Sequence, residues 1–336
     1  MENAIIRVLV FTVGGWMLAT CLTPFYTTLA YKYKWWKRER KVDLLGREMP
    51  VIASIKAKKQ IERRFPTMAG VIGVAAVAIL TLLFNWTRSQ TYLATLGLLM
   101  GGTLGMLDDI INIWSAGRGT AGLDARAKLF FTIAIGVFLG WWFYSRMGWS
   151  SVFVPFLGDF NIGLFIIPLF AFAVTSIANS VNITDGRDGL SGGLLAIAFA
   201  SFGIIALIGG RFGIAVFCGT MVGVLLSYLW FNVTPARFMM GDVGSFAYGT
   251  ALAVVAMMTD AFLLVPFVGF IFVLESGSVI LQNASKLIRK KKLFLASPLH
   301  WHLEASGWPE AKIVMRMWVL AAVMATFGIL LYVAGR

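Results

Sequence analysis

Residues 92–109 read YLATLGLLMGGTLGMLDD, an apolar run that ends in two adjacent aspartates. About 18 mostly apolar residues are enough to cross a bilayer as a helix. A charge close to hydrocarbon costs several kcal/mol unless it faces a cavity, a partner or a metal, so acids at such a boundary are candidate functional residues. This stretch therefore predicts both a membrane span and a polar site at its end.

Similar apolar runs recur along the chain, which is 59% hydrophobic. There are about ten runs of this kind. They cover roughly residues 4–30, 68–86, 92–107, 129–146, 162–181, 190–208, 212–231, 244–258, 261–285 and 313–334. The polar stretches between them are too short and too charged to bury a core. The sequence thus predicts an all-α, polytopic membrane protein whose residues 1–336 form a single integral-membrane domain.

The formal net charge is +13, and its distribution predicts how the chain is oriented. Loops after the first, third, fifth, seventh and ninth runs hold all but five of the 29 lysines and arginines. Because cytoplasmic loops are enriched in these residues, we expect the five loops in the cytoplasm and both termini outside it. Basic clusters beside a span normally meet anionic lipid, which argues against a nucleic-acid partner.

The loop after the third run, called the third loop, follows Asp108 and Asp109. Adjacent side chains on a helix point about 100° apart, so one carboxylate can face a metal or substrate while the other supports it. Acids also oppose the macrodipole at the C-terminus of a helix, which favours a functional role over a plain polar helix end.

The fifth and seventh loops combine small and polar residues. They contain NSVNITDGRDGL at 179–190 and GDVGS at 241–245. Glycines let a ligand approach the backbone, and Asn and Asp can hydrogen-bond a ring's amide groups. Exposed backbone N–H groups suit phosphate, and the Asp242 carboxylate suits a hard cation such as Mg²⁺.

The ninth loop holds the only two histidines of the chain, His300 and His302. His-X-His with a nearby Glu and no Cys is an incomplete structural zinc site, so phosphate binding fits at least as well. In the first loop, Thr67 follows Pro66 as at an ordinary helix start. Beside the other loops, the preceding Arg63 and Arg64 also suit a phosphate contact.

The ordered set of motifs resembles the polyprenyl-phosphate sugar-phosphate transferases, and most closely the bacterial phospho-N-acetylmuramoyl-pentapeptide transferases. The motifs are PTM at 66–68, DD at 108–109, NITDGRDGL at 182–190, MGDVGS at 240–245 and PLHWHLEASGWPE at 298–310. The resemblance implies transfer of phospho-MurNAc-pentapeptide from UDP-MurNAc-pentapeptide to undecaprenyl phosphate, giving lipid I and UMP. It also implies Mg²⁺ as cofactor and the bacterial inner membrane as location. Because the family is often dimeric, a homodimer is a further expectation.

The resemblance also implies roles for individual residues. Asp108, Asp109 and Asp242 match catalytic positions, with Asp242 as the Mg²⁺ ligand. Positions for substrate binding are matched by Thr67, Lys128, Asn182, Asp185, Asp188, Asn232, Ser245, Gln282, His300 and His302. Two departures stand out: Trp301 replaces the middle of three consecutive histidines, and Met239 replaces an aromatic residue that commonly stacks on uracil.

Three alternatives remain open from the sequence. A transferase of the same superfamily could use another UDP-sugar, such as UDP-N-acetylglucosamine. A transporter or lipid flippase would place ionisable groups near the bilayer midplane on broken helices, whereas here they lie at span ends on one face. A catalytically inactive member is disfavoured because Asp108, Asp109 and Asp242 are all present.

Overall fold

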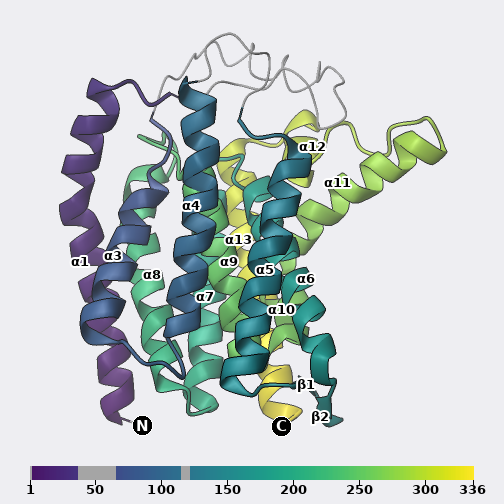
Figure 1. Ribbon diagram of the computed structural model, residues 1–336. Coiled ribbons are helices and arrows are strands. Elements are labelled where there is room, and N and C mark those ends of the chain that lie inside the picture. Colours follow the sequence, from purple (N-terminus) through teal and green to yellow (C-terminus); the bar gives the residue numbers. More distant parts are fainter. Residues whose placement is uncertain (1, 37–65, 115–121) are drawn as a thin grey trace.

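The computed structural model describes residues 2–36, 66–114 and 122–336, and Figure 1 shows a bundle of long helices. The helices are α1 (Glu2–Lys32), α3 (Gly70–Phe84), α4 (Tyr92–Trp114), α5 (Ala125–Met147), α6 (Ile166–Thr184), α7 (Leu190–Ile208), α8 (Phe212–Asn232), α9 (Gly241–Met258), α10 (Val265–Val268), α11 (Phe270–Ile288), α12 (Leu299–Ala305) and α13 (Glu310–Ala334). Short 3₁₀ turns precede two of them: η1 (Gly163–Phe165) and η2 (Phe262–Leu264).

Each predicted apolar run is helical in the described part of the chain, which is a multi-pass membrane protein. Among the described residues, eight helices are long and apolar enough to cross a membrane. α3 is apolar but has only 15 residues. The run predicted at 261–285 is split into Phe262–Val268 and α11, which are bent by 85° and make a ninth candidate span if counted together. The total of about ten crossings therefore stays a prediction.

The helices differ in how much of their surface lies inside the protein. Only 11% of the apolar window of α1 is buried, whereas that of α9 is 100% buried. Exposed apolar side chains in such a protein face lipid, so α1 is peripheral and α9 is central. α4, α6 and α3 pack around α9.

Glycines bring α4 and α9 close together. A Cβ added at Gly101 would lie 2.4 Å from the Phe246 carbonyl oxygen, and one at Gly105 would lie 2.0 Å from the Asp242 carbonyl oxygen. Small residues of this kind allow the backbones of membrane helices to approach. The close crossing sets the Asp-bearing end of α4 against the start of α9.

The chain is not purely helical as predicted, because a small hairpin follows α5. Strands β1 (Ser151–Val154) and β2 (Gly158–Asn161) pair antiparallel with Val154 opposite Gly158. β-branched and aromatic side chains favour this extended backbone over four residues, too short a signal to separate from a loop. Figure 1 places the hairpin and both termini at one end of the bundle, and α12 at the other. Termini on one side fit an even number of crossings; which side this is stays a prediction.

Candidate active site

α4 extends further than its apolar run indicates, which corrects one step of the sequence argument. It ends at Trp114 rather than near residue 107, so Asp108 and Asp109 lie inside the helix. The macrodipole acts mainly on the last turn, so its opposition to these acids is weaker than expected. Their placement is explained instead by contacts with α9 and α5.

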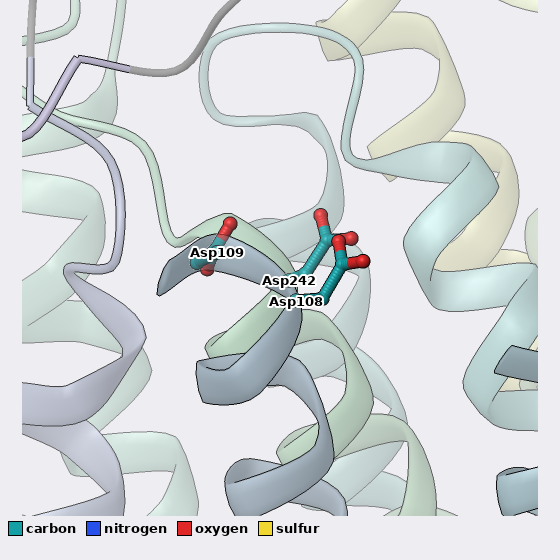
Figure 2. A group of neighbouring side chains, drawn as sticks. All are labelled: Asp108, Asp109 and Asp242. Carbon is teal, nitrogen blue, oxygen red and sulfur yellow. The ribbon is translucent and has the colours of Figure 1, made fainter. Parts of the chain in front are cut away.

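Three aspartates from two helices form a buried cluster. Asp108, Asp109 and Asp242 each offer a carboxylate oxygen, and these oxygens lie within 4.8 Å of one another. Figure 2 shows Asp108 and Asp242 side by side, with Asp109 set apart near the end of α4. The predicted divergence of the adjacent carboxylates is confirmed.

Lys128, in the first turn of α5, bridges two of these acids. Its Nζ lies 2.7 Å from Asp108 Oδ2 and 2.6 Å from Asp242 Oδ2. Asp108 is also held by the backbone N–H of Leu123, which donates to Oδ1 at 2.5 Å. Two carboxylates of the cluster thus hold one buried ammonium group.

Asp109 anchors the start of α9. Its Oδ2 accepts the backbone N–H of Val243 at 3.0 Å. Gly241 has φ +73, and a Cβ there would come within 2.5 Å of the same carboxylate oxygen. Only glycine allows both the positive φ and the close approach of the carboxylate without strain. Asp109 therefore sets the position of Asp242, which lies between Gly241 and Val243 in the chain.

Thr67 lies against this anchor. The backbone N–H of Met239 donates to the Pro66 carbonyl, and that of Ala69 donates to the Met239 carbonyl, both at 3.0 Å. The buried Thr67 hydroxyl has no hydrogen-bond partner among the described residues. Arg63 and Arg64 lie outside the described residues.

Side-chain hydrogen bonds join the loop before α7 to the loop after α8. Asn232 accepts the Gly189 N–H at 2.8 Å and donates to the Phe238 carbonyl at 2.7 Å. Asp188 accepts the Ala236 N–H at 3.0 Å. Asn232 and Asp188, which were both predicted to bind substrate, therefore also fix the backbone of these two loops.

The remaining polar residues of the fifth loop point toward α7 and α9. Asp185 accepts a hydrogen bond from the Ser191 hydroxyl at 2.8 Å. Asn182 donates to the Ser245 hydroxyl at 2.9 Å, and Ser245 is one turn after Asp242. The contact of Asn182 with Ser245 brings the fifth loop next to the helix that carries Asp242.

His300 forms a fully buried pair with Glu275 of α11. The carboxylate accepts the His300 backbone N–H at 3.1 Å and lies 3.0 Å from Nδ1. The opposite ring nitrogen, Nε2, has no partner among the described residues and faces Gly186. Sequence reasoning missed Glu275, although a lone acid within an apolar run was an available signal.

Gln282 and His302 support the loop between α11 and α12 (residues 289–298), here called the basic loop because it begins with Arg289 and three lysines. The Gln282 Oε1 accepts the backbone N–H groups of Leu293 and Phe294, each at 2.9 Å. His302 Nδ1 accepts the Leu295 N–H at 3.2 Å. Their predicted contact with substrate stays a prediction, and the structure gives them a role in holding this loop.

Arg187 links the fifth loop to the last two helices and was missed as well. Its guanidinium lies 3.7 Å from the centroid of the Trp301 ring and forms ion pairs with Glu304 and Glu310. Burial lowers the pKa of Arg187, against the effect of nearby carboxylates. Trp301 is thus a stacking partner for an arginine.

The comparisons with known proteins agree with this geometry. The pattern of glycosyl transferase family 4 matches residues 91–260, which include all three aspartates. A phospho-N-acetylmuramoyl-pentapeptide-transferase of Levilactobacillus brevis is 37% identical over 79% of this chain and 83% of its own length. Enzymes of that name from Caldanaerobacter subterraneus (37%, 77% and 81%) and Chloroflexus aurantiacus (34%, 79% and 76%) are similar too.

The chain therefore belongs to glycosyl transferase family 4 and, within it, to the family of phospho-N-acetylmuramoyl-pentapeptide-transferases. The resemblance inferred from the ordered motifs is confirmed. Some motifs lie outside the matched range 91–260, among them Thr67 and the histidine loop. Thr67 lies beside Gly241, and His300 lies beside Gly186 of the fifth loop.

Proposed function

We propose that the chain transfers phospho-MurNAc-pentapeptide from UDP-MurNAc-pentapeptide to undecaprenyl phosphate, forming lipid I and releasing UMP. The buried cluster of Asp108, Asp109 and Asp242 is the observation that carries the proposal. The activity in the names of the relatives supports this choice of substrates over another UDP-sugar.

In the proposed reaction, a phosphate oxygen of the lipid attacks the β-phosphorus of the nucleotide sugar. The bond from that phosphorus to the oxygen shared with UMP breaks, and UMP leaves with the bonding electrons. Phosphoryl transfer chiefly needs positioning and charge neutralisation. Because a phosphate monoester is largely ionised at pH 7, we assign Asp108 to positioning rather than to proton removal.

Mg²⁺ is the proposed cofactor, with Asp242 as its ligand. Carboxylate oxygens are the donors that this hard cation prefers, and the cluster brings three of them within 4.8 Å of one another. A bound Mg²⁺ would offset the charge of the transferring diphosphate. Asp109 would hold the metal ligand in place through Val243.

The other predicted residues have proposed roles in substrate binding. Asn182, Asp185, Asp188, Asn232 and Ser245 would form the wall of the nucleotide-sugar pocket, since their mutual contacts fix the loops there. Lys128, His300 and His302 would face phosphates as basic groups. Thr67 has a buried hydroxyl beside the aspartates and would contact the same ligands. Gln282 would act through the basic loop that it holds.

The test is release of UMP by the purified full-length protein in detergent. We expect release only when UDP-MurNAc-pentapeptide, undecaprenyl phosphate and Mg²⁺ are all present, and we expect its loss in Asp242→Asn. Robust turnover of Asp242→Asn would contradict the metal role. Competition with UDP-N-acetylglucosamine separates the two substrate classes, and reaction of that compound alone would overturn the choice made here.

The proposal also includes the side of the membrane on which the site lies and the membrane that holds the protein. The basic loops support a cytoplasmic site, extracytoplasmic termini and the bacterial inner membrane as location. Single-cysteine labelling of residues beside Asp185 and Asp242 from each side of sealed vesicles would check the orientation. The single domain over residues 1–336 and the homodimer stay predictions.

A further inference from the structure

The ammonium group of Lys128 lies between the carboxylates of Asp108 and Asp242, groups of the kind that bind metal ions. Its ammonium contacts Asp108 Oδ2 and Asp242 Oδ2 at 2.7 and 2.6 Å, and only 8% of the residue is exposed. A buried ammonium is costly unless it is paired and hydrogen-bonded. Two charged acceptors meet that need, so the acidic site is already partly neutralised without a metal.

A divalent cation and this ammonium would compete for the same carboxylates. Mg²⁺ requires oxygens at about 2.0–2.1 Å in a near-octahedral arrangement. Lys128 donates to Oδ2 of Asp242, the carboxylate that would hold the metal. Two cations bound to one carboxylate group repel each other strongly in a buried site. Simultaneous occupancy is therefore unfavourable.

We propose, resting on the metal site of the proposed function, that Lys128 is the resident cation of the acidic cluster and that a divalent metal binds Asp242 only by displacing it. Lysine suits this role because its compact charge sits on a flexible stem of four carbons. The displaced ammonium becomes available to a phosphate group of the substrates. Metal binding would thus release a basic group at the moment when anionic substrates need one.

Mn²⁺ binding to the purified full-length protein, followed by electron paramagnetic resonance without substrate, tests the displacement. We expect Lys128→Gln to bind Mn²⁺ about tenfold more tightly than wild type, because the competing charge is gone. Arg126→Gln is the matched control, since Arg126 is an exposed cation two residues away on the same helix turn. Screening by solvent should keep its effect below about twofold.

The outcomes separate the inference from the proposed function. Equal Mn²⁺ affinity of Lys128→Gln and Arg126→Gln would overturn the displacement, even if Asp242→Asn abolishes binding. If Lys128→Gln with Asp242→Asn still binds Mn²⁺ as tightly as Lys128→Gln alone, the metal site of the proposed function is wrong and the inference falls with it.

A second measurement uses the wild-type protein alone, and so does not depend on the variant folding. Amine acylation followed by peptide mass spectrometry should show Lys128 protected without metal and several-fold more reactive when Mg²⁺ is added. Lys312, which is exposed on α13, should react equally in both conditions. Unchanged or lower labelling of Lys128 with Mg²⁺ would overturn the proposal.

Discussion

The two ends of the bundle both bury charged side chains, but they balance charge differently. At the end that holds the termini, Arg211 stacks 4.6 Å from the Trp149 ring and interacts electrostatically with Asp260. Asp260 also accepts the Phe153 N–H of the hairpin at 3.0 Å. At the opposite end, the ammonium of Lys128 bridges Asp108 and Asp242, and Asp109 lies in the same cluster of three carboxylates.

This difference separates a structural cluster from a functional one. A cluster with balanced charge that bonds to backbone and aromatic rings is complete by itself. An excess of negative charge in a buried site stays costly until a cation or a positively charged partner binds. Substitutions at the two ends should therefore have different effects on turnover and on stability.

The largest expected effect is at the acidic end. Asp108→Asn keeps the size and one acceptor oxygen of the side chain but removes its charge. We expect UMP release to fall on the order of 10²–10³-fold, as when one preorganised electrostatic group is lost, with little change in thermal unfolding. Asp260→Asn is the matched change at the other end and should leave turnover within about twofold. Equal losses in the two variants would abolish the distinction.

The next effect concerns Arg187, which joins the fifth loop to α12 and α13. Arg187→Met leaves Glu304 and Glu310 without their buried partner, which should lower the free energy of unfolding by about 3 kcal/mol. Chemical denaturation in detergent measures this loss. Arg237→Met, an exposed arginine of the neighbouring loop, is the control and should be almost neutral. A neutral Arg187→Met would mean that the stacking and ion pairs add nothing.

A smaller effect is expected for Glu275. In Glu275→Ala the buried N–H of His300 loses its acceptor, which should cost about 1–3 kcal/mol. Glu275→Gln retains an acceptor oxygen and should recover most of that stability. Thermal unfolding of both variants checks this order. If Glu275→Gln is as unstable as Glu275→Ala, the negative charge rather than the hydrogen bond carries the effect.

The smallest effect belongs to the balanced end and depends on pH. Burial raises the pKa of Asp260, despite the Phe153 hydrogen bond and the charge of Arg211. A carboxyl with a raised folded-state pKa favours folding when protonated, so its contribution to stability falls as pH rises through that pKa. Asp260→Asn should therefore raise the melting temperature at pH 7 by about 1–3 °C. The gain should vanish below about pH 4, near the unfolded pKa; a constant gain would exclude ionisation as its cause.

The sequence could predict that the site residues lie on one side of the membrane, because successive loops of a multi-pass protein lie on alternate sides. Runs that cross a membrane place every second loop on one side, so the segments of Asp108, Asp185, Asp242 and His300 had to share a face. Their contacts in the structure agree. The glycines of α4 were visible too, but their packing against α9 needed the neighbouring helix.

The bend before α11 and the partners of Arg187 and Glu275 could not be predicted from local sequence patterns. Hydropathy reports the length of an apolar run but not its direction, so the 85° bend before α11 was missed. Gly269, at the junction, has low helix propensity, yet many spans tolerate glycine. The partners of Arg187 and Glu275 lie more than 20 residues away in sequence. Such pairings follow from helix packing, which no local pattern encodes.

The complete enclosure of α9 has a consequence for how the bilayer acts on the site. Asp242 lies on a helix that no acyl chain reaches, so a change in membrane thickness or fluidity acts directly on the outer helices only. Those helices can tilt while the central one keeps its place. Lipid composition should therefore govern how the polyprenyl substrate arrives rather than the shape of the acidic cluster that receives it.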